Sequence, residues 1–160
     1  QPLAVVLWGP DFDGVVAASL VCGLRRAGVR VKLVGVQGRS VAGQQGLTLL
    51  PDLALGQVGK LAAPIACLAI PCAAAYLTPL LSDPRVGELW QRALADEACW
   101  VVPADWPSAL LANSARPPLL YPTASVLAPV VAEVVLALTG READWSITCL
   151  PAGADILRSG

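Results

Sequence analysis

Few residues in this chain could carry out chemistry, because its 160 residues include no histidine and only five cysteines. The cysteines are odd in number, irregularly spaced and without a C-x-x-C pair, which favours free thiols over a disulfide framework. A zinc site without histidine would need several scattered cysteines to converge, so we expect no metal site and interpret most thiols as small buried hydrophobes. The five are Cys22, Cys67, Cys72, Cys99 and Cys149.

One of these cysteines, Cys72, is a candidate nucleophile. It follows Pro71 at the end of a predicted strand, where a reactive thiol could be assisted by Asp13 or Asp105. The alternative interpretation is a structural cysteine, which is the commoner role of a thiol beside an apolar strand. Both interpretations stay open on the sequence alone.

The turn of residues 9–14, GPDFDG, carries two aspartates after the first predicted strand. It matches neither G-x-G-x-x-G nor G-x-x-x-x-G-K-[ST], and Asp11 and Asp13 would repel a phosphate, which argues against nucleotide and flavin binding. Two such aspartates also occur in phosphoacceptor receiver domains. However, no aspartate ends the apolar run of residues 65–70 and no suitably placed lysine follows, so receiver chemistry is disfavoured.

The overall composition excludes further classes of function. Lys and Arg number 11 and Asp and Glu number 12, a net charge of −1 without a run of like charges, so we expect no nucleic-acid partner. The longest apolar stretches, 61–77 and 125–140, are interrupted by prolines or by Glu133, so we expect no membrane span. No secretory signal is visible, and we expect a cytoplasmic protein.

The candidate residues must be positioned by alternating strands and helices. Strands are predicted over residues 3–8, 29–36, 47–50, 65–70, 98–102 and 147–150. Helices are predicted over residues 12–27, 83–95, 107–111 and 125–138, and loops over 35–46 and 112–121. Strands apolar on both faces suit a parallel sheet with helices on each side. We therefore predict one α/β domain over residues 1–160, a three-layer α/β/α sandwich with a mainly parallel, flavodoxin-like, doubly wound sheet.

Five segments carry a family resemblance through their order and spacing. They are LRRAG at 24–28, GLTLLPD at 46–52, LAIP at 68–71, WVV at 100–102 with the following Pro107, and TAS at 123–125. Together they resemble the DJ-1/PfpI (ThiJ/PfpI) superfamily over most of the chain. The resemblance implies the fold that this superfamily shares with class I glutamine amidotransferases.

The resemblance also implies where chemistry would take place. In the family a cysteine thiolate acts at a sharp strand-to-helix elbow. Here the elbow corresponds to residues 102–107, and Ala104 stands at the position of the nucleophile, so the elbow is degenerate. Asp105 and Trp106 replace small residues that leave room for substrate, which predicts a pocket that is both filled and acidic.

Other parts of the family's machinery are also missing. The family's acidic partner falls at Val16, its oxyanion-hole glycines map to Cys72 and Ala73, and its histidine has no counterpart. The segment between Leu111 and Thr123 is too short for the extra strands usual there. Each departure is expected to cost orders of magnitude in rate, so we interpret the chain as a pseudoenzyme without a cofactor.

The leading hypothesis is a non-catalytic protein-binding or scaffolding module that self-associates as a homodimer. Hydrophobic residues make up 56% of the chain and charged residues 14%, so part of the surface is expected to meet a partner. Exposed tryptophans would be the anchors of such an interface, although Trp8 and Trp100, on predicted strands, are expected in the core. The tryptophans are Trp8, Trp90, Trp100, Trp106 and Trp145.

Two alternatives place function at a small-molecule pocket. The first is a ligand-sensing domain of a regulator, with its site at the carboxyl ends of the strands near Asp13, Cys72, Asp105 and Trp106. The second is a hydrolase- or glyoxalase-like enzyme whose chemistry has moved to Cys72. The first needs only a pocket, whereas the second needs an accessible thiolate.

Overall fold

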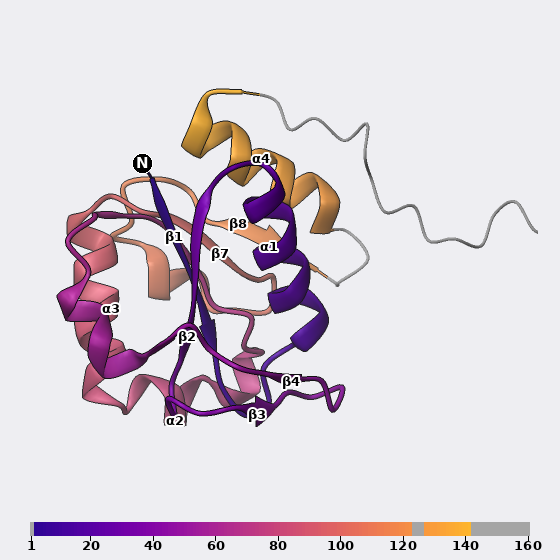
Figure 1. The fold of residues 1–160 in the computed structure, drawn as a ribbon. Coiled ribbons are helices and arrows are strands. Elements are labelled where there is room, and N and C mark those ends of the chain that lie inside the picture. The colour runs from indigo at the N-terminus through magenta and orange to yellow at the C-terminus, as the bar shows by residue number, and fades with distance from the viewer. Residues whose placement is uncertain (1, 123–126, 142–160) are drawn as a thin grey trace, which may run out of the picture.

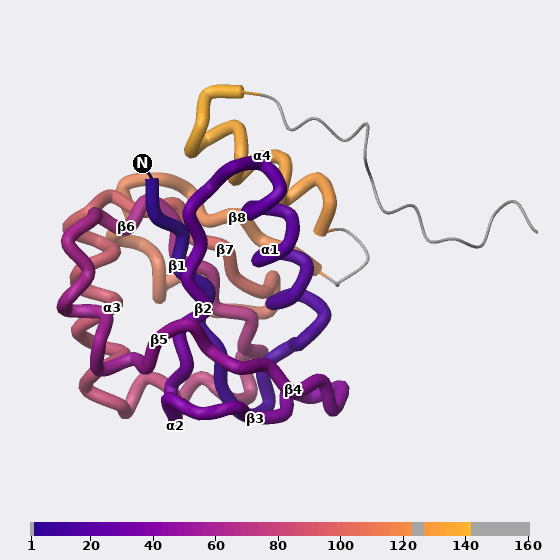
Figure 2. The backbone as a smooth tube through the Cα atoms, viewed as in Figure 1, coloured from indigo at the N-terminus to yellow at the C-terminus, as the bar shows by residue number. Residues whose placement is uncertain are grey.

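The structure, a computed structural model, describes residues 2–122 and 127–141. Within these residues the core is a six-stranded sheet in the order β5-β2-β1-β6-β7-β8, and every neighbouring pair is parallel. Figure 2 shows β6 and β2 on either side of β1. The strands are β1 Leu3–Trp8, β2 Arg30–Gly35, β5 Leu53–Ala54, β6 Ile65–Ala69, β7 Cys99–Pro103 and β8 Leu119–Tyr121.

Helices cover both faces of this sheet (Figure 1), which confirms the predicted α/β/α sandwich. On one face α1 and α4 pack together, and a Cβ added to Gly23 of α1 would lie 2.7 Å from Val131 Cγ1 of α4. On the other face α3 packs against β6 and the turn η1. The helices are α1 Gly14–Arg26, α2 Leu77–Leu81, α3 Pro84–Ala95 and α4 Leu127–Thr139, and the 3₁₀ turns are η1 Leu55–Lys60, η2 Ala74–Tyr76 and η3 Ser108–Leu111.

The first strand and helix form as their sequence predicts. All six residues of β1 are buried, as expected of a central strand of a parallel sheet. The α1 helix begins after Asp13, whose side chain accepts hydrogen bonds from the backbone N–H groups of Val15 and Val16. It ends before Gly28, whose φ of 78° is the left-handed conformation in which glycine is the usual residue.

The prediction for residues 35–50 is right about the strand and wrong about the loop before it. The predicted strand 47–50 contains β4 Thr48–Leu49. The predicted loop 35–46 contains β3 Val41–Ala42, which pairs with β4 in an antiparallel hairpin separate from the main sheet. Tertiary contacts hold this hairpin, since Trp8 Nε1 donates to the carbonyl of Val41 at 3.2 Å. The two edges of the main sheet are β5 and β8.

The predictions around the elbow also need correction. The predicted helix at 107–111 is only the single 3₁₀ turn η3, which ends where the Ser114 hydroxyl donates to the carbonyl of Leu111 at 2.7 Å. The predicted loop 112–121 contains β8. The prolines on both sides of this strand led to the loop prediction, but proline is tolerated beside an edge strand. The helix α2 is not predicted by the sequence at all.

Two further predictions concern the last strand and a membrane span. The predicted strand 147–150 lies outside the described residues. Among the helices of residues 2–122 and 127–141, none combines the length and the apolar character that crossing a bilayer requires.

Candidate functional site

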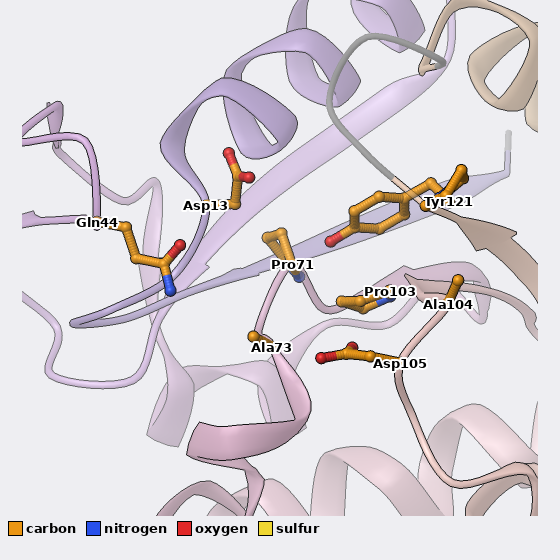
Figure 3. A pocket seen from close by; sticks show the side chains of 9 residues that line it. Asp13, Gln44, Pro71, Ala73, Pro103, Ala104, Asp105 and Tyr121 are labelled. Carbon is orange, nitrogen blue, oxygen red and sulfur yellow. The ribbon is translucent and has the colours of Figure 1, made fainter.

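A cavity of about 230 Å³ lies at the carboxyl ends of the strands, beside the elbow that follows β7 (Figure 3). This is the end of an open α/β sheet at which ligands usually bind. The volume is below the roughly 300–1,000 Å³ of sites for drug-sized ligands, so the cavity suits a small molecule. Its polar side chains are Asp13, Gln44, Asp105 and Tyr121, and the rest of its wall consists of Pro71, Ala73, Pro103, Ala104 and Pro122.

The loop before α1 places Asp13 at the cavity, as the sequence predicts. The Asp13 N–H donates to the carbonyl of Pro71 at 2.8 Å, which ties this loop to the segment after β6. One carboxylate oxygen, Oδ1, caps α1 by accepting from the N–H groups of Val15 and Val16 at 3.0 and 3.1 Å. The other oxygen makes no hydrogen bond to the described residues and remains available to a ligand.

The elbow places Ala104 and Asp105 at the same cavity. The Ala104 N–H donates to the carbonyl of Tyr121 at 2.9 Å, so the elbow is fixed to the end of β8. The Asp105 Oδ2 atom accepts from the N–H of Ala74 at 3.1 Å, which joins the elbow to the turn after β6. Where the resemblance places a nucleophile, the cavity is therefore lined by a methyl group with a carboxylate beside it (Figure 3).

Trp106 does not line the cavity, although the sequence places it there. Its side chain is 7% exposed and lies parallel to the ring of Trp90, with the ring centroids 6.1 Å apart and an angle of 9° between the planes. Its Nε1 donates to the carbonyl of Cys72 at 2.6 Å. The pocket predicted to be filled and acidic is therefore acidic but open, because Trp106 is directed into the core behind it.

Cys72 is also near the cavity without forming part of its lining. Its side chain is fully buried, and its Sγ donates to the carbonyl of Ala73 at 3.6 Å. Burial, followed by the negative charges of Asp105 and Asp11, raises the pKa of the Cys72 thiol to about 12. A thiol that is buried and protonated at neutral pH is a poor nucleophile, which argues against chemistry relocated to Cys72.

Tyr121 and Gln44 are site residues that the sequence analysis missed. The Tyr121 side chain is 5% exposed, its hydroxyl points into the cavity, and it makes no hydrogen bond to the described residues (Figure 3). Burial and the negative charges of Asp13 and Asp105 raise the pKa of this phenol. Gln44 comes from the β3–β4 hairpin, where its N–H donates to the carbonyl of Phe12. Both residues lie in predicted loops, so no periodic pattern indicated them.

The remaining described cysteines lie away from the cavity lining and are free thiols. Cys67 and Cys99 are buried opposite each other on β6 and β7, and Cys22 is exposed on α1. Within residues 2–122 and 127–141, no three cysteine or carboxylate side chains lie close enough together to hold a metal ion. Cys149 lies outside the described residues.

Comparison with known proteins gives a clear result for structure and none for sequence. No protein-family model and no curated protein matches the chain. Drosophila melanogaster DJ-1beta superposes with a TM-score of 0.73 at 16% identity, over 88% of this chain and 92% of its own. This chain has a DJ-1-like fold. An alanine-for-cysteine mutant of a Salmonella typhimurium DJ-1 superfamily protein gives 0.71 at 14% identity, over 89% and 93% of the two chains.

A further DJ-1 structure superposes less closely on this chain. Oxidised Toxoplasma gondii DJ-1 matches with a TM-score of 0.59 at 20% identity, over 72% of this chain and 62% of its own. At such identities the likeness establishes the fold, and what the cavity does must be argued from its own residues.

Proposed function

We propose that this chain is a non-catalytic binding module built on the DJ-1-like fold. The observation that carries the proposal is the cavity wall, which presents the methyl group of Ala104 at the elbow while the candidate thiol, Cys72, is buried with a pKa of about 12. The remaining hydroxyl, on Tyr121, has a raised pKa and so stays protonated. The described cavity wall therefore offers neither a thiolate nor an ionised hydroxyl as a nucleophile.

The position of Val16 supports the same proposal. The resemblance places an acidic partner there, but the valine side chain is fully buried in the core beneath α1. The oxyanion-hole positions are occupied by Cys72, with its buried side chain, and by Ala73, and the chain has no histidine. Loss of several cooperating groups would lower the rate by orders of magnitude.

We place the primary binding function at the outer face of α4, defined by Ala128, Pro129, Glu133, Leu136 and Ala137. All five residues are exposed, and Glu133 is the only charged residue among them. A helix that is apolar on its outer side as well as its inner side gains by burying the outer side against another protein. The proposed occupant is a second copy of this chain, which would make a homodimer with like faces in contact.

Tryptophans do not support the anchor role predicted for them. Of the four that the structure describes, Trp8, Trp100 and Trp106 are buried, and Trp90 is half-buried against Trp100 and Trp106. They stabilise the core, and aliphatic residues remain as the candidate contacts of an interface. Trp145 lies outside the described residues.

Light scattering after size-exclusion chromatography tests the self-association. We expect the wild-type mass to rise with concentration towards twice the 16.5 kDa of one chain. Leu136→Glu places a charge on the α4 face and should weaken association at least about tenfold. Leu50→Glu is the matched control. Leu50 is 76% exposed, but it directly follows β4 and is not part of the α4 face. A wild-type protein that stays monomeric at every concentration would overturn the homodimer.

A second candidate function is binding of a small ligand, as in the sensing domain of a regulator. The observation that favours it is the Tyr121 hydroxyl, which points into the cavity without a partner among the described residues. For both candidates we propose a cytoplasmic location, which the free thiols Cys22, Cys67 and Cys99 support.

A further inference from the structure

The cavity brings together two carboxylates from segments that are far apart in the sequence. Asp13 belongs to the loop before α1 and Asp105 to the elbow after β7 (Figure 3). Each uses one oxygen in hydrogen bonds to backbone N–H groups and has a second oxygen without a hydrogen-bond partner among the described residues. Two hydrogen-bond acceptors with negative charge therefore remain free at one small site.

No positive side chain of the described residues offsets these charges within the cavity. The lining that the structure describes contains neither lysine nor arginine. The described ion pairs all lie elsewhere, because they join Arg25 to Asp52, Arg85 to Asp83, and Arg92 to Asp96. A positively charged ligand would meet uncompensated acceptors, whereas an anion would be repelled by both carboxylates.

Tyr121 gives an independent indication that a ligand belongs in the cavity. Its side chain is more than nine-tenths buried, yet its hydroxyl faces the cavity without a hydrogen bond to the described residues. The phenol oxygen is therefore accessible at the cavity and can accept a hydrogen bond from a ligand that carries an N–H group. The hydroxyl proton can in turn be donated to a carboxylate.

From this arrangement we infer that the cavity binds a small organic cation, with a primary ammonium or guanidinium head group. Its N–H groups donate to the free oxygens of Asp13 and Asp105 and to the phenol oxygen of Tyr121, and its short alkyl part contacts Pro71 and Pro103. The cavity volume of about 230 Å³ suits a ligand of this size. The assignment rests on the second candidate function, ligand binding, and names its ligand class.

A hard metal ion fits the same side chains less well. Calcium takes about six to eight oxygen ligands. The described lining supplies fewer side-chain oxygens, because its two carboxylates are each already engaged through one oxygen and only Gln44 and Tyr121 add one oxygen each. The apolar remainder of the wall, which includes Ala104 and Pro122, contributes no side-chain ligand. An alkyl chain, by contrast, gains from contact with these groups.

The test is a titration of ¹⁵N-labelled protein followed by amide NMR signals. The probes are n-butylammonium and methylguanidinium, with n-butanol and butyrate as neutral and anionic probes of similar size, and calcium chloride as the metal probe. We expect the two organic cations to shift the amide signals of Asp13, Ala74 and Ala104 in a saturable way. The neutral, anionic and metal probes should leave these signals unchanged.

Three conservative variants locate the binding. Asp13→Asn and Asp105→Asn should each weaken cation binding about tenfold or more, because each removes one charge-assisted hydrogen bond. Both keep an acceptor oxygen for the backbone, and asparagine caps a helix as well as aspartate does. Tyr121→Phe should weaken binding severalfold. Asp11→Asn is the matched control. Asp11 lies in the same loop but outside the cavity lining, so removal of its charge should weaken binding less than either site variant does, and asparagine tolerates its φ of 64°.

Each contrary result has a distinct meaning. If butyrate or butanol binds at these amides and the cations do not, the ligand class is wrong while ligand binding stands. If calcium shifts the same signals, the cavity is a metal site and the inference is overturned. If no probe shifts them, or if Asp11→Asn weakens binding as much as Asp105→Asn does, the cation site is also overturned. Light scattering then remains the separate test of self-association.

Discussion

The cavity and the outer face of α4 are two regions suited to binding, and they are built from opposite materials. The cavity is lined by two carboxylates and a phenol. Hydrogen bonds to the backbone connect the segments that carry these side chains. The α4 face is a helix surface of exposed aliphatic side chains with Glu133 as its charge. Directional polar groups select a ligand by its hydrogen bonds, whereas an aliphatic face selects a partner mainly by shape. The two proposed functions can therefore be separated by mutation.

The largest expected difference concerns chemical reactivity at the cavity. A pKa near 12 in place of 9 lowers the thiolate fraction of Cys72 roughly a thousandfold at neutral pH. We expect iodoacetamide to alkylate the exposed Cys22 first and to leave Cys72 unmodified in the folded protein, as mass spectrometry of peptides would show. Cys72→Ala should not change the labelling of the native protein. Rapid alkylation of Cys72 would show that the segment after β6 carries a reactive thiol.

The next difference concerns stability. Trp106→Ala removes a buried ring that lies on Trp90 and bonds to the carbonyl of Cys72, so we expect the free energy of unfolding to fall by about 3–5 kcal/mol. Leu136→Ala on the α4 face should change it by no more than about 0.5 kcal/mol. Urea unfolding of both variants, at a concentration where the protein is monomeric, measures the two values. Equal losses would contradict the distinction between a packed elbow and a free helix face.

The smallest expected effects are those of each region on the function of the other. Asp105→Asn should leave the association constant from light scattering within about twofold of wild type, because interactions of distant sites are independent. Leu136→Glu should leave the n-butylammonium affinity from NMR equally unchanged. A large cross-effect in either direction would show that the cavity and the α4 face are coupled, and that the protein has one binding function rather than two.

The main elements could be predicted from the sequence because they depend on local patterns. The strands β1, β6 and β7 are apolar runs, and α1 has a capping aspartate at one end and Gly28 at the other. The positions of Asp13 and Asp105 at the cavity were predictable too, because each lies in the loop after a strand of a parallel sheet, Asp13 after β1 and Asp105 after β7.

The other site residues depend on contacts between distant segments. Tyr121 lies in a three-residue strand that forms only by pairing with β7, and Gln44 lies in a hairpin held against Phe12 and Trp8. The direction of the Trp106 side chain depends on its stacking with Trp90, which no local pattern indicates. Tertiary contacts of this kind override local preference, so the sequence predicted the place of the elbow but not its packing.

The central claim is that this chain is a binding module without catalytic activity, and a turnover assay tests it most directly. Wild type and Cys72→Ala would be incubated at high concentration with methylglyoxal, an α-oxoaldehyde, and with an activated p-nitrophenyl ester, while substrate loss is followed over time. We predict that both proteins consume each substrate no faster than buffer does. Catalytic turnover by the wild type that Cys72→Ala or Asp105→Asn abolishes would contradict the claim and identify the chain as an enzyme.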